Sequence, residues 1–167
     1  MNQFYGKYRG KVIDNVDPKQ IGCIRVSVPA VLGTGTQSWA YPCVPYAGIQ
    51  TGFFAIPPIG ANVWVEFEGG DPDHPIWTGC FWGPGETPAL ALLSPPTIAH
   101  IAMQTTMQNS LLISDAPGPA GGILLQTATG AMISINQTGI LISNGQGATI
   151  AMNGPAVAIN QNGLVVT

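Results

Sequence analysis

Charge is the property that this sequence has least of. Only 8% of its 167 residues are Asp, Glu, Lys or Arg, whereas an ordinary soluble domain has roughly 25%. All of them but one lie between Lys7 and Glu86, and Asp115 alone follows. A long stretch with so little charge is poorly soluble unless other chains cover its surface. The charge distribution therefore predicts a homo-oligomer.

Other absences exclude several classes of function. The net charge of −3 disfavours nucleic acid as a partner, because binding to it needs a basic surface that displaces counterions. The N-terminal residues contain no apolar signal segment, and no apolar run is long enough for a membrane helix. Cys23, Cys43 and Cys80 have no metal-binding spacing, and we interpret them as small hydrophobic residues. No catalytic motif is present, so we predict no enzyme, no cofactor and no metal site.

The first half of the chain has the pattern of short β-strands. Apolar and polar residues alternate along segments that end at Gly, Pro or Asp, which is typical of strands with one buried face. The expected strands are residues 8–14, 21–29, 52–56, 62–68 and 75–82, with 40–46 as an edge strand or loop. This set favours a small closed barrel of the OB type, with almost no helix.

The second half repeats an apolar-x-apolar triplet. Gly and Asn, which favour turns, separate the triplets. From Ile133 onward the triplets start ten or seven residues apart. A repeat of this kind predicts stacked short strands, as in a solenoid or β-helix. We expect the unequal spacing to mark turns of unequal length at the corners of a three-sided shaft.

The first half also resembles a known family. The motifs are Tyr8-x-Gly10-x-Val12, the segment from Gly22 to Pro29, Trp39-Ala40, Pro57-Pro58-Ile59-Gly60 and the run VWVEFEGGDPDHPIWTGCFW from Val63 to Trp82. They resemble the OB-fold domain of the central spike proteins of contractile tails. Phage baseplate assembly protein V, the VgrG proteins of type VI secretion and the spikes of extracellular contractile injection systems belong to this family. The repetitive second half is similar to the β-helical needle of these spikes.

The resemblance implies an architecture. The fold class is all-β, with an N-terminal OB-fold domain at residues 1–86, a linker at 87–97, and a C-terminal intertwined trimeric β-helix, or β-prism needle, at 98–167. In such a trimer each strand would pair with neighbouring chains, so that no strand edge stays open. The inward side chains would form a continuous apolar axis. The expected axis residues are Ile133, Ile135, Ile140, Ile142, Ile150, Met152, Val157 and Ile159.

The resemblance also implies a function and partners. The homotrimer would plug the tube and hub of a contractile injection machine and puncture the target cell envelope, with transient contact with the target membrane. We expect a separate hub protein at the tube end and a PAAR-type tip protein at the other end. Because the C-terminus carries no metal-binding His, the expected docking residues for the tip protein are Leu164, Val165, Val166 and Thr167. The chain would assemble in the cytoplasm into the baseplate of a virion or phage-tail-like particle.

Three clusters leave alternatives open. Asp71, Asp73 and His74 form either a metal or acid–base site or a charged turn, and the turn is favoured. Glu66 and Glu68 are either a hydrolytic carboxylate pair, or solvated outer-face residues, or partners of Arg25, and the last two are favoured. The tryptophans either pack or form a stacking platform, and they are Trp39, Trp64, Trp77 and Trp82. The platform would suit an alternative function, an OB-fold binding module for glycan or single-stranded nucleic acid on a β-solenoid stalk.

Overall fold

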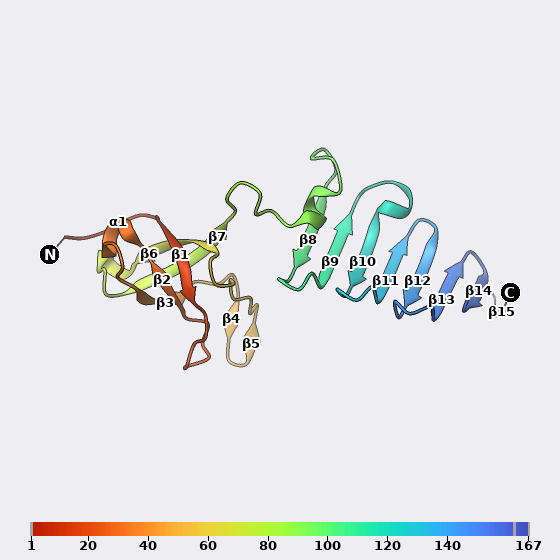
Figure 1. Cartoon of the computed structure of the whole chain (residues 1–167), viewed down its shortest axis with the longest axis horizontal. Coiled ribbons are helices and arrows are strands. Elements are labelled where there is room, and N and C mark those ends of the chain that lie inside the picture. The colour runs from red at the N-terminus through yellow and green to blue at the C-terminus, as the bar shows by residue number, and fades with distance from the viewer. Residues whose placement is uncertain (1, 162, 167) are drawn as a thin grey trace. The chain divides into compact units, whose positions relative to one another are not determined.

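The chain is built almost entirely from strands. The computed structural model describes residues 2–161 and 163–166. They divide into two compact units, Met1–Glu86 and Thr87–Thr167, whose strands are labelled in Figure 1. Helical structure in the described residues is limited to single turns, which are α1 (Pro29–Leu32), η1 (Glu68–Gly70), η2 (Ala89–Leu92) and η3 (Gly118–Ala120). The predicted all-β class is confirmed.

The first unit is a closed barrel. Its strands are β1 (Tyr8–Asp14), β2 (Ile24–Ser27), β3 (Ser38–Pro42), β6 (Asn62–Phe67) and β7 (Pro75–Phe81). They follow the order β1-β2-β3-β7-β6 around the barrel. The pairing is antiparallel except between β3 and β7, which run parallel. This closed five-stranded arrangement confirms the OB-type barrel.

Alternation along the strands fills the barrel interior. Val63, Val65 and Phe67 of β6 point inward, and the residues between them are only half-buried. Ile24 and Val26 do the same on β2. The remaining buried members of this core are Val12, Val28, Ala40 and Trp77. The Trp77 Nε1–H donates to the Gly22 carbonyl at 3.0 Å, so its polar group is satisfied inside the core.

The segment between β3 and β6 differs from the prediction. Residues 52–56 were expected to form a strand, but only Gly52 of that segment lies in one. The observed strands are β4 (Ala47–Gly48) and β5 (Thr51–Gly52), which pair as a two-stranded hairpin. The apolar run that follows is not a buried strand, because Phe53 and Phe54 stay on the surface and only Ile56 packs against the core.

The second unit is one antiparallel sheet. Its strands are β8 (His100–Gln104), β9 (Ser110–Ser114), β10 (Gly122–Gln126), β11 (Met132–Asn136), β12 (Gly139–Ser143), β13 (Thr149–Asn153), β14 (Ala156–Ile159) and β15 (Leu164–Val166). Each strand pairs with the next one along the chain, so the spatial order is the sequence order. Figure 1 shows this meander running from β8 to β15.

The pairing corrects two expectations for the repeat. Strands β9 to β14 have both edges occupied by strands of the same chain. Their backbone hydrogen bonds are therefore made within one chain and not with neighbouring chains. The ten- and seven-residue spacing does not mark the corners of a shaft within one chain. It arises because long connections, such as 127–131 and 144–148, alternate with two-residue turns at 137–138 and 154–155. From β10 onward, the long and the short connections lie at opposite ends of the strands.

One glycine shows how closely these strands approach. Gly139 begins β12 with a φ of +143°, a conformation that residues with a Cβ rarely adopt. A Cβ at Gly139 would overlap the Met152 carbonyl oxygen on β13. By contrast, Gly147 has a φ of +102° and open space around it, in the connection after β12. The tight approach at Gly139 therefore requires glycine for steric as well as conformational reasons.

Candidate assembly face of the second unit

One face of the second sheet carries two parallel rows of large apolar side chains. Adjacent strands pair in a register that places Ile135 opposite Ile140, and Ile140 opposite Met152. We call this surface the two-row face. Its first row is Ile101, Ile113, Ile123, Ile135, Ile140, Met152 and Val157, and its second row is Met103, Leu111, Leu125, Ile133, Ile142, Ile150, Ile159 and Leu164.

The two-row face is largely uncovered in the single chain. Ile101 is 61% exposed and Ile150 is 37% exposed, with most of the row residues between these values. Soluble monomers rarely expose a continuous apolar patch larger than a few hundred Å². An uninterrupted double row across the seven strands β8 to β14 is therefore a surface that the assembled protein is expected to cover.

The exposed fractions of these side chains set the free energy that covering the two-row face contributes. Full burial of such a side chain contributes about 1.5–3 kcal/mol. Ile133, Ile142 and Ile150 are each 37–38% exposed in the chain alone. Covering the rest of each side chain therefore contributes about 0.6–1.1 kcal/mol. The sheet itself already buries the larger part of these three side chains. Covering the two-row face adds a smaller stabilisation for each side chain, which is repeated along both rows.

All eight predicted axis residues lie on the two-row face. The prediction did not extend to β8, β9 and β10, which continue both rows upstream. The missed row residues are Ile101, Met103, Leu111, Ile113, Ile123 and Leu125. Their alternation along each strand is the same as that of the predicted residues. The signal that could have found them was this alternation, because the longer connections around them hide the regular spacing.

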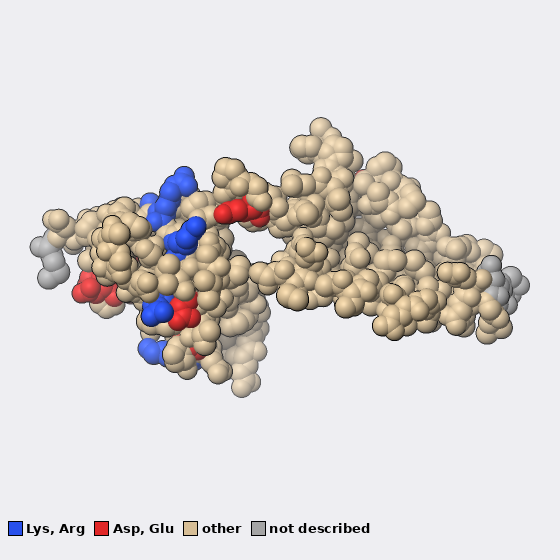
Figure 2. Space-filling model, in the orientation of Figure 1, with Lys and Arg blue, Asp and Glu red and all other residues tan. Residues whose placement is uncertain are grey.

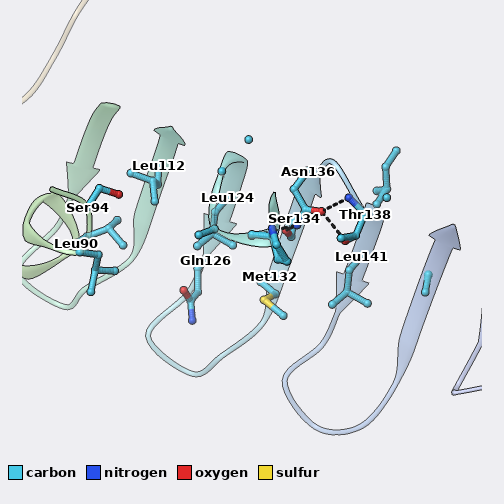
Figure 3. A pocket seen from close by; sticks show the side chains of 18 of the residues that line it. Leu90, Ser94, Leu112, Leu124, Gln126, Met132, Ser134, Asn136, Thr138 and Leu141 are labelled. Carbon is cyan, nitrogen blue, oxygen red and sulfur yellow. Dashed lines mark hydrogen bonds between the residues drawn. The ribbon is translucent and has the colours of Figure 1, made fainter. Parts of the chain in front are cut away.

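The opposite face has a single apolar row with polar flanks. The register runs Leu112, Leu124, Ser134 and Leu141 along the middle of the sheet. This row forms the floor of a groove of about 630 Å³, which is drawn in Figure 3. Asn136 lies at its margin, where its Oδ1 accepts from the Thr138 backbone N–H at 2.9 Å and from the Thr138 hydroxyl at 2.6 Å. Of the two faces, this one suits contact with water better.

The start of the second unit also contributes to this groove. Leu90 of η2 and the nearby Leu93 line it together with Leu112 (Figure 3). The predicted linker at 87–97 is thus not a featureless spacer, because its apolar residues pack on the sheet that follows.

Charge is nearly absent from the second unit. Asp115 is its only Asp, Glu, Lys or Arg, and it is exposed. Figure 2 shows the coloured side chains over the barrel and a second unit whose visible face is almost entirely uncharged. Apolar association on the two-row face would therefore meet no charge to desolvate.

The last strand carries the predicted tip-docking residues. Leu164, Val165 and Val166 form β15, the final strand in the sheet order. Leu164 is 56% exposed. Thr167, the fourth predicted residue, lies outside the described residues.

The charged clusters of the barrel are structural in character. Asp71 Oδ1 accepts from the Asp73 backbone N–H at 3.0 Å, and its Oδ2 lies 3.2 Å from His74 Nδ1. The Asp73 backbone N–H and then His74 hold the pKa of Asp71 below its usual value. Among the described residues no group of three His, Cys, Asp or Glu side chains is placed to hold a metal ion. The favoured interpretation, a charged turn, agrees with this geometry.

Of the two favoured interpretations of Glu66 and Glu68, solvated residues or partners of Arg25, the pairing with Arg25 is not observed. Its guanidinium pairs with Asp14 at 3.1 Å. Glu66 instead pairs with Lys7 at 2.8 Å, because Lys7 lies beside β6 just ahead of β1.

The tryptophans do not form a common platform. Trp77 is buried. Trp64 is half-buried, with its ring centroid 4.6 Å from that of Phe81 and the Arg9 guanidinium 5.0 Å away. Trp82 is exposed on its own beyond the end of β7. Trp39 is 37% exposed, with the Arg25 guanidinium 5.9 Å from its ring. Trp77 and Trp64 thus pack within the barrel, whereas Trp39 and Trp82 stay on its surface.

Comparison with known families identifies both units. Residues 8–82 match the family model of the type VI secretion system/phage-baseplate injector OB domain. Residues 100–165, which contain the whole two-row face, match that of the phage baseplate V C-terminal trimerisation domain. Together the two matches support a baseplate-spike or VgrG-like protein. The chain is therefore a structural component of a contractile injection system, located in the baseplate, and its trimerisation domain supports the predicted homotrimer.

A curated relative extends this similarity to type VI secretion. Actin cross-linking toxin VgrG1 of Vibrio cholerae serotype O1 is 48% identical over 54 residues, which are 32% of this chain and 5% of the relative. The alignment thus spans a small part of the relative's length. Within the described residues, none of the helices has the length and apolarity needed to cross a membrane.

Proposed function

We propose that three copies of this chain form the central spike of a contractile injection machine. The three sheets would bring their two-row faces together around a common axis, with the expected residues Ile133 to Ile159 on that axis. The spike would plug the tube and hub and puncture the envelope of the target cell, touching its membrane only transiently. The observation that carries this proposal is the uncharged two-row face in a unit that matches a trimerisation domain.

The division of labour within the spike follows from the two units. The barrel carries all the Lys and Arg residues of the chain, which suits polar contact with a separate hub protein at the tube end. Residues 87–97 would join it to the needle at 98–167. The role is mechanical, and the chain would act without catalysis. It would assemble in the cytoplasm before the particle is released.

A PAAR-type tip protein would dock on the far end of the needle. β15 offers an exposed Leu164 and, within the described residues, lies at the end of the sheet order. Deleting residues 160–167 is expected to abolish binding of the tip protein in a pull-down assay with the full spike. Tip binding at the normal level by the shortened chain would refute this part of the proposal.

The oligomeric mass tests the proposal as a whole. Native mass spectrometry of the full chain at micromolar concentration should give three times the 17.3 kDa of one chain. We also expect the trimer to resist SDS without boiling, because a continuous apolar axis leaves few sites where a detergent molecule can enter. A monomer in native buffer would refute the spike. Binding to an oligonucleotide or glycan, lost on substitution of Trp64, would instead support the alternative binding module.

A further inference from the structure

The outer face of β1 carries two positively charged side chains that have no carboxylate partner among the described residues. Arg9 and Lys11 lie two residues apart on this face and are both exposed, so their Cα atoms are about 7 Å apart. Two other cations of the barrel, Lys7 and Arg25, have carboxylate partners at 2.8 and 3.1 Å. The barrel therefore presents two adjacent positive charges to its surroundings.

Two aromatic rings hold the Arg9 guanidinium in place. Its central carbon lies 5.0 Å from the centroid of the Trp64 ring and 4.9 Å from that of the Phe81 ring. Both rings are half-buried, so they form a fixed support. Stacking on aromatic faces is attractive and orients the guanidinium plane, while its N–H groups can still donate at the edge. Arg9 is thus pre-organised for a planar acceptor, and a carboxylate can take two parallel hydrogen bonds from it.

A hollow of about 410 Å³ lies against Arg9 and Lys11, and we call it the β1 hollow. Ser27 on β2 and Asn62 on β6 lie on either side of Lys11 in the sheet and also line it. Pro29 and Phe81 add apolar surface, and no Asp or Glu is among the lining residues. Concave apolar surfaces with a few convergent polar groups are typical of ligand sites. In the β1 hollow two of these polar groups are cations.

One carboxylate of the chain already reaches the wall of the β1 hollow. Asn62 Nδ2 donates to Glu86 Oε2 at 2.7 Å, and the Gly83 backbone N–H donates to the same oxygen at 2.6 Å. Glu86 thus occupies the amide donor of the hollow rather than its two cations. A guanidinium and an ammonium group remain for a ligand, and such groups form their strongest hydrogen bonds with anionic oxygens.

We infer that the β1 hollow binds a carboxylate side chain from an acidic segment of a partner protein. Arg9 and Lys11 donate to the carboxylate, and its aliphatic stem packs on Phe81. Charge complementarity favours a short acidic segment over a long polyanion. Nucleic acid and anionic membranes bind to broad basic surfaces, whereas here two cations stand alone in a chain with a net charge of −3. The inference rests on the proposed polar contact of the barrel with a second protein, and it does not depend on the trimer.

Titration of the full-length protein with an acidic peptide tests the inference. The probe is acetylated hexaglutamate, and isothermal titration calorimetry measures its affinity. The titration is done at low ionic strength, because salt screens the attraction between exposed charges. We expect saturable binding whose affinity falls at least about ten-fold at high salt.

Lys11→Gln and Lys19→Gln form a matched pair of variants. Each removes one positive charge from an exposed side chain, but Lys19 lies beside the Tyr41 ring and does not line the β1 hollow. Lys11→Gln should weaken hexaglutamate binding at least about five-fold, and Lys19→Gln should change it less than about two-fold. Arg9→Lys keeps the charge but loses the planar fork, so it should also weaken binding.

The outcomes separate the inference from the proposed function. Absence of hexaglutamate binding, or equal losses in Lys11→Gln and Lys19→Gln, overturns the inference. Tighter binding of a deoxythymidine oligonucleotide or of phosphatidylcholine–phosphatidylglycerol vesicles, lost in Lys11→Gln, also overturns it, in favour of a phosphate ligand. In each of these cases a trimeric mass leaves the spike intact. A monomeric mass with binding that depends on Lys11 overturns the spike and supports the inference.

Discussion

The two-row face makes a strong prediction for neighbouring residues on one strand. Thr149 and Ile150 are adjacent in β13, so their side chains point to opposite faces of the sheet. Ile150→Asp places a carboxylate on the two-row face, and Thr149→Asp places the same carboxylate on the other face. Because the residue introduced and the strand are the same, the loss of intrinsic β-propensity is similar, at most about 1 kcal/mol.

The magnitude follows from the exposure of Ile150. Covering its remaining 37% contributes about 0.6–1.1 kcal/mol in each chain. A carboxylate taken out of water without a partner costs a further several kcal/mol. In the proposed trimer three copies meet at the same level, so the total cost is on the order of 10 kcal/mol per trimer. Ile150→Asp should therefore be monomeric at micromolar concentration near neutral pH.

Native mass spectrometry and light scattering after size exclusion measure the outcome. Thr149→Asp should remain a trimer, and Ile150→Asn, which carries no charge, should be intermediate. The Ile150→Asp trimer should return partly below about pH 4, where an aspartic acid side chain becomes neutral. If Ile150→Asp stays trimeric near neutral pH, or if Thr149→Asp dissociates equally, the two-row face is not the trimer axis.

Two further predictions concern stability. Desolvation raises the pKa of Asp17, but the backbone N–H groups that donate to it outweigh this and hold it below 3.8, and the pKa of Asp71 is also lowered. The folded barrel therefore binds protons less readily than the unfolded chain, so its free energy of unfolding is full above about pH 4 and falls below that pH. Denaturant melts of the full chain should show the barrel transition weakening below about pH 4, while the transition of the nearly uncharged second unit is unaffected. Equal pH sensitivity of both transitions would contradict this prediction. Gly139→Ala should lower the melting temperature of the second unit by clearly more than Gly147→Ala. Alanine is strained at the positive φ of both positions, but only at Gly139 would its Cβ overlap a neighbouring carbonyl. Equal shifts of the melting temperature would show that this steric contact is unimportant.

The barrel could be predicted well from the sequence because the alternation of apolar and polar residues along each strand shows which of its faces is buried. The alternation of Val63, Val65 and Phe67 predicts a strand, an inward face and a place in the core at once. The same reasoning gives a wrong prediction for the run Phe53-Phe54-Ala55-Ile56. In the sequence, apolar residues that stay on the surface cannot be distinguished from those of a buried strand. Only the hairpin geometry separates the two.

The second unit was predicted at the level of its repeat but not of its pairing. The triplets locate the strands, and their inward positions locate the two-row face. The sequence cannot state whether Ile140 lies beside Ile135 of the same chain or of a neighbour, since both arrangements bury the same side chains. The two-residue turn at 137–138 decides the question, because so short a connection brings β11 and β12 together as a hairpin.

The meander has a mechanical consequence. Its strands lie across the direction in which the sheet extends, so the hydrogen bonds from β8 to β15 point along that direction. Pushing on the two ends presses each strand onto the next, and strands about 4.8 Å apart resist further approach by close repulsion. Pulling on the ends opens one strand pair at a time, with few hydrogen bonds loaded at any moment. The unit is therefore expected to be stiff when compressed and to open stepwise under tension, as the proposed spike would require.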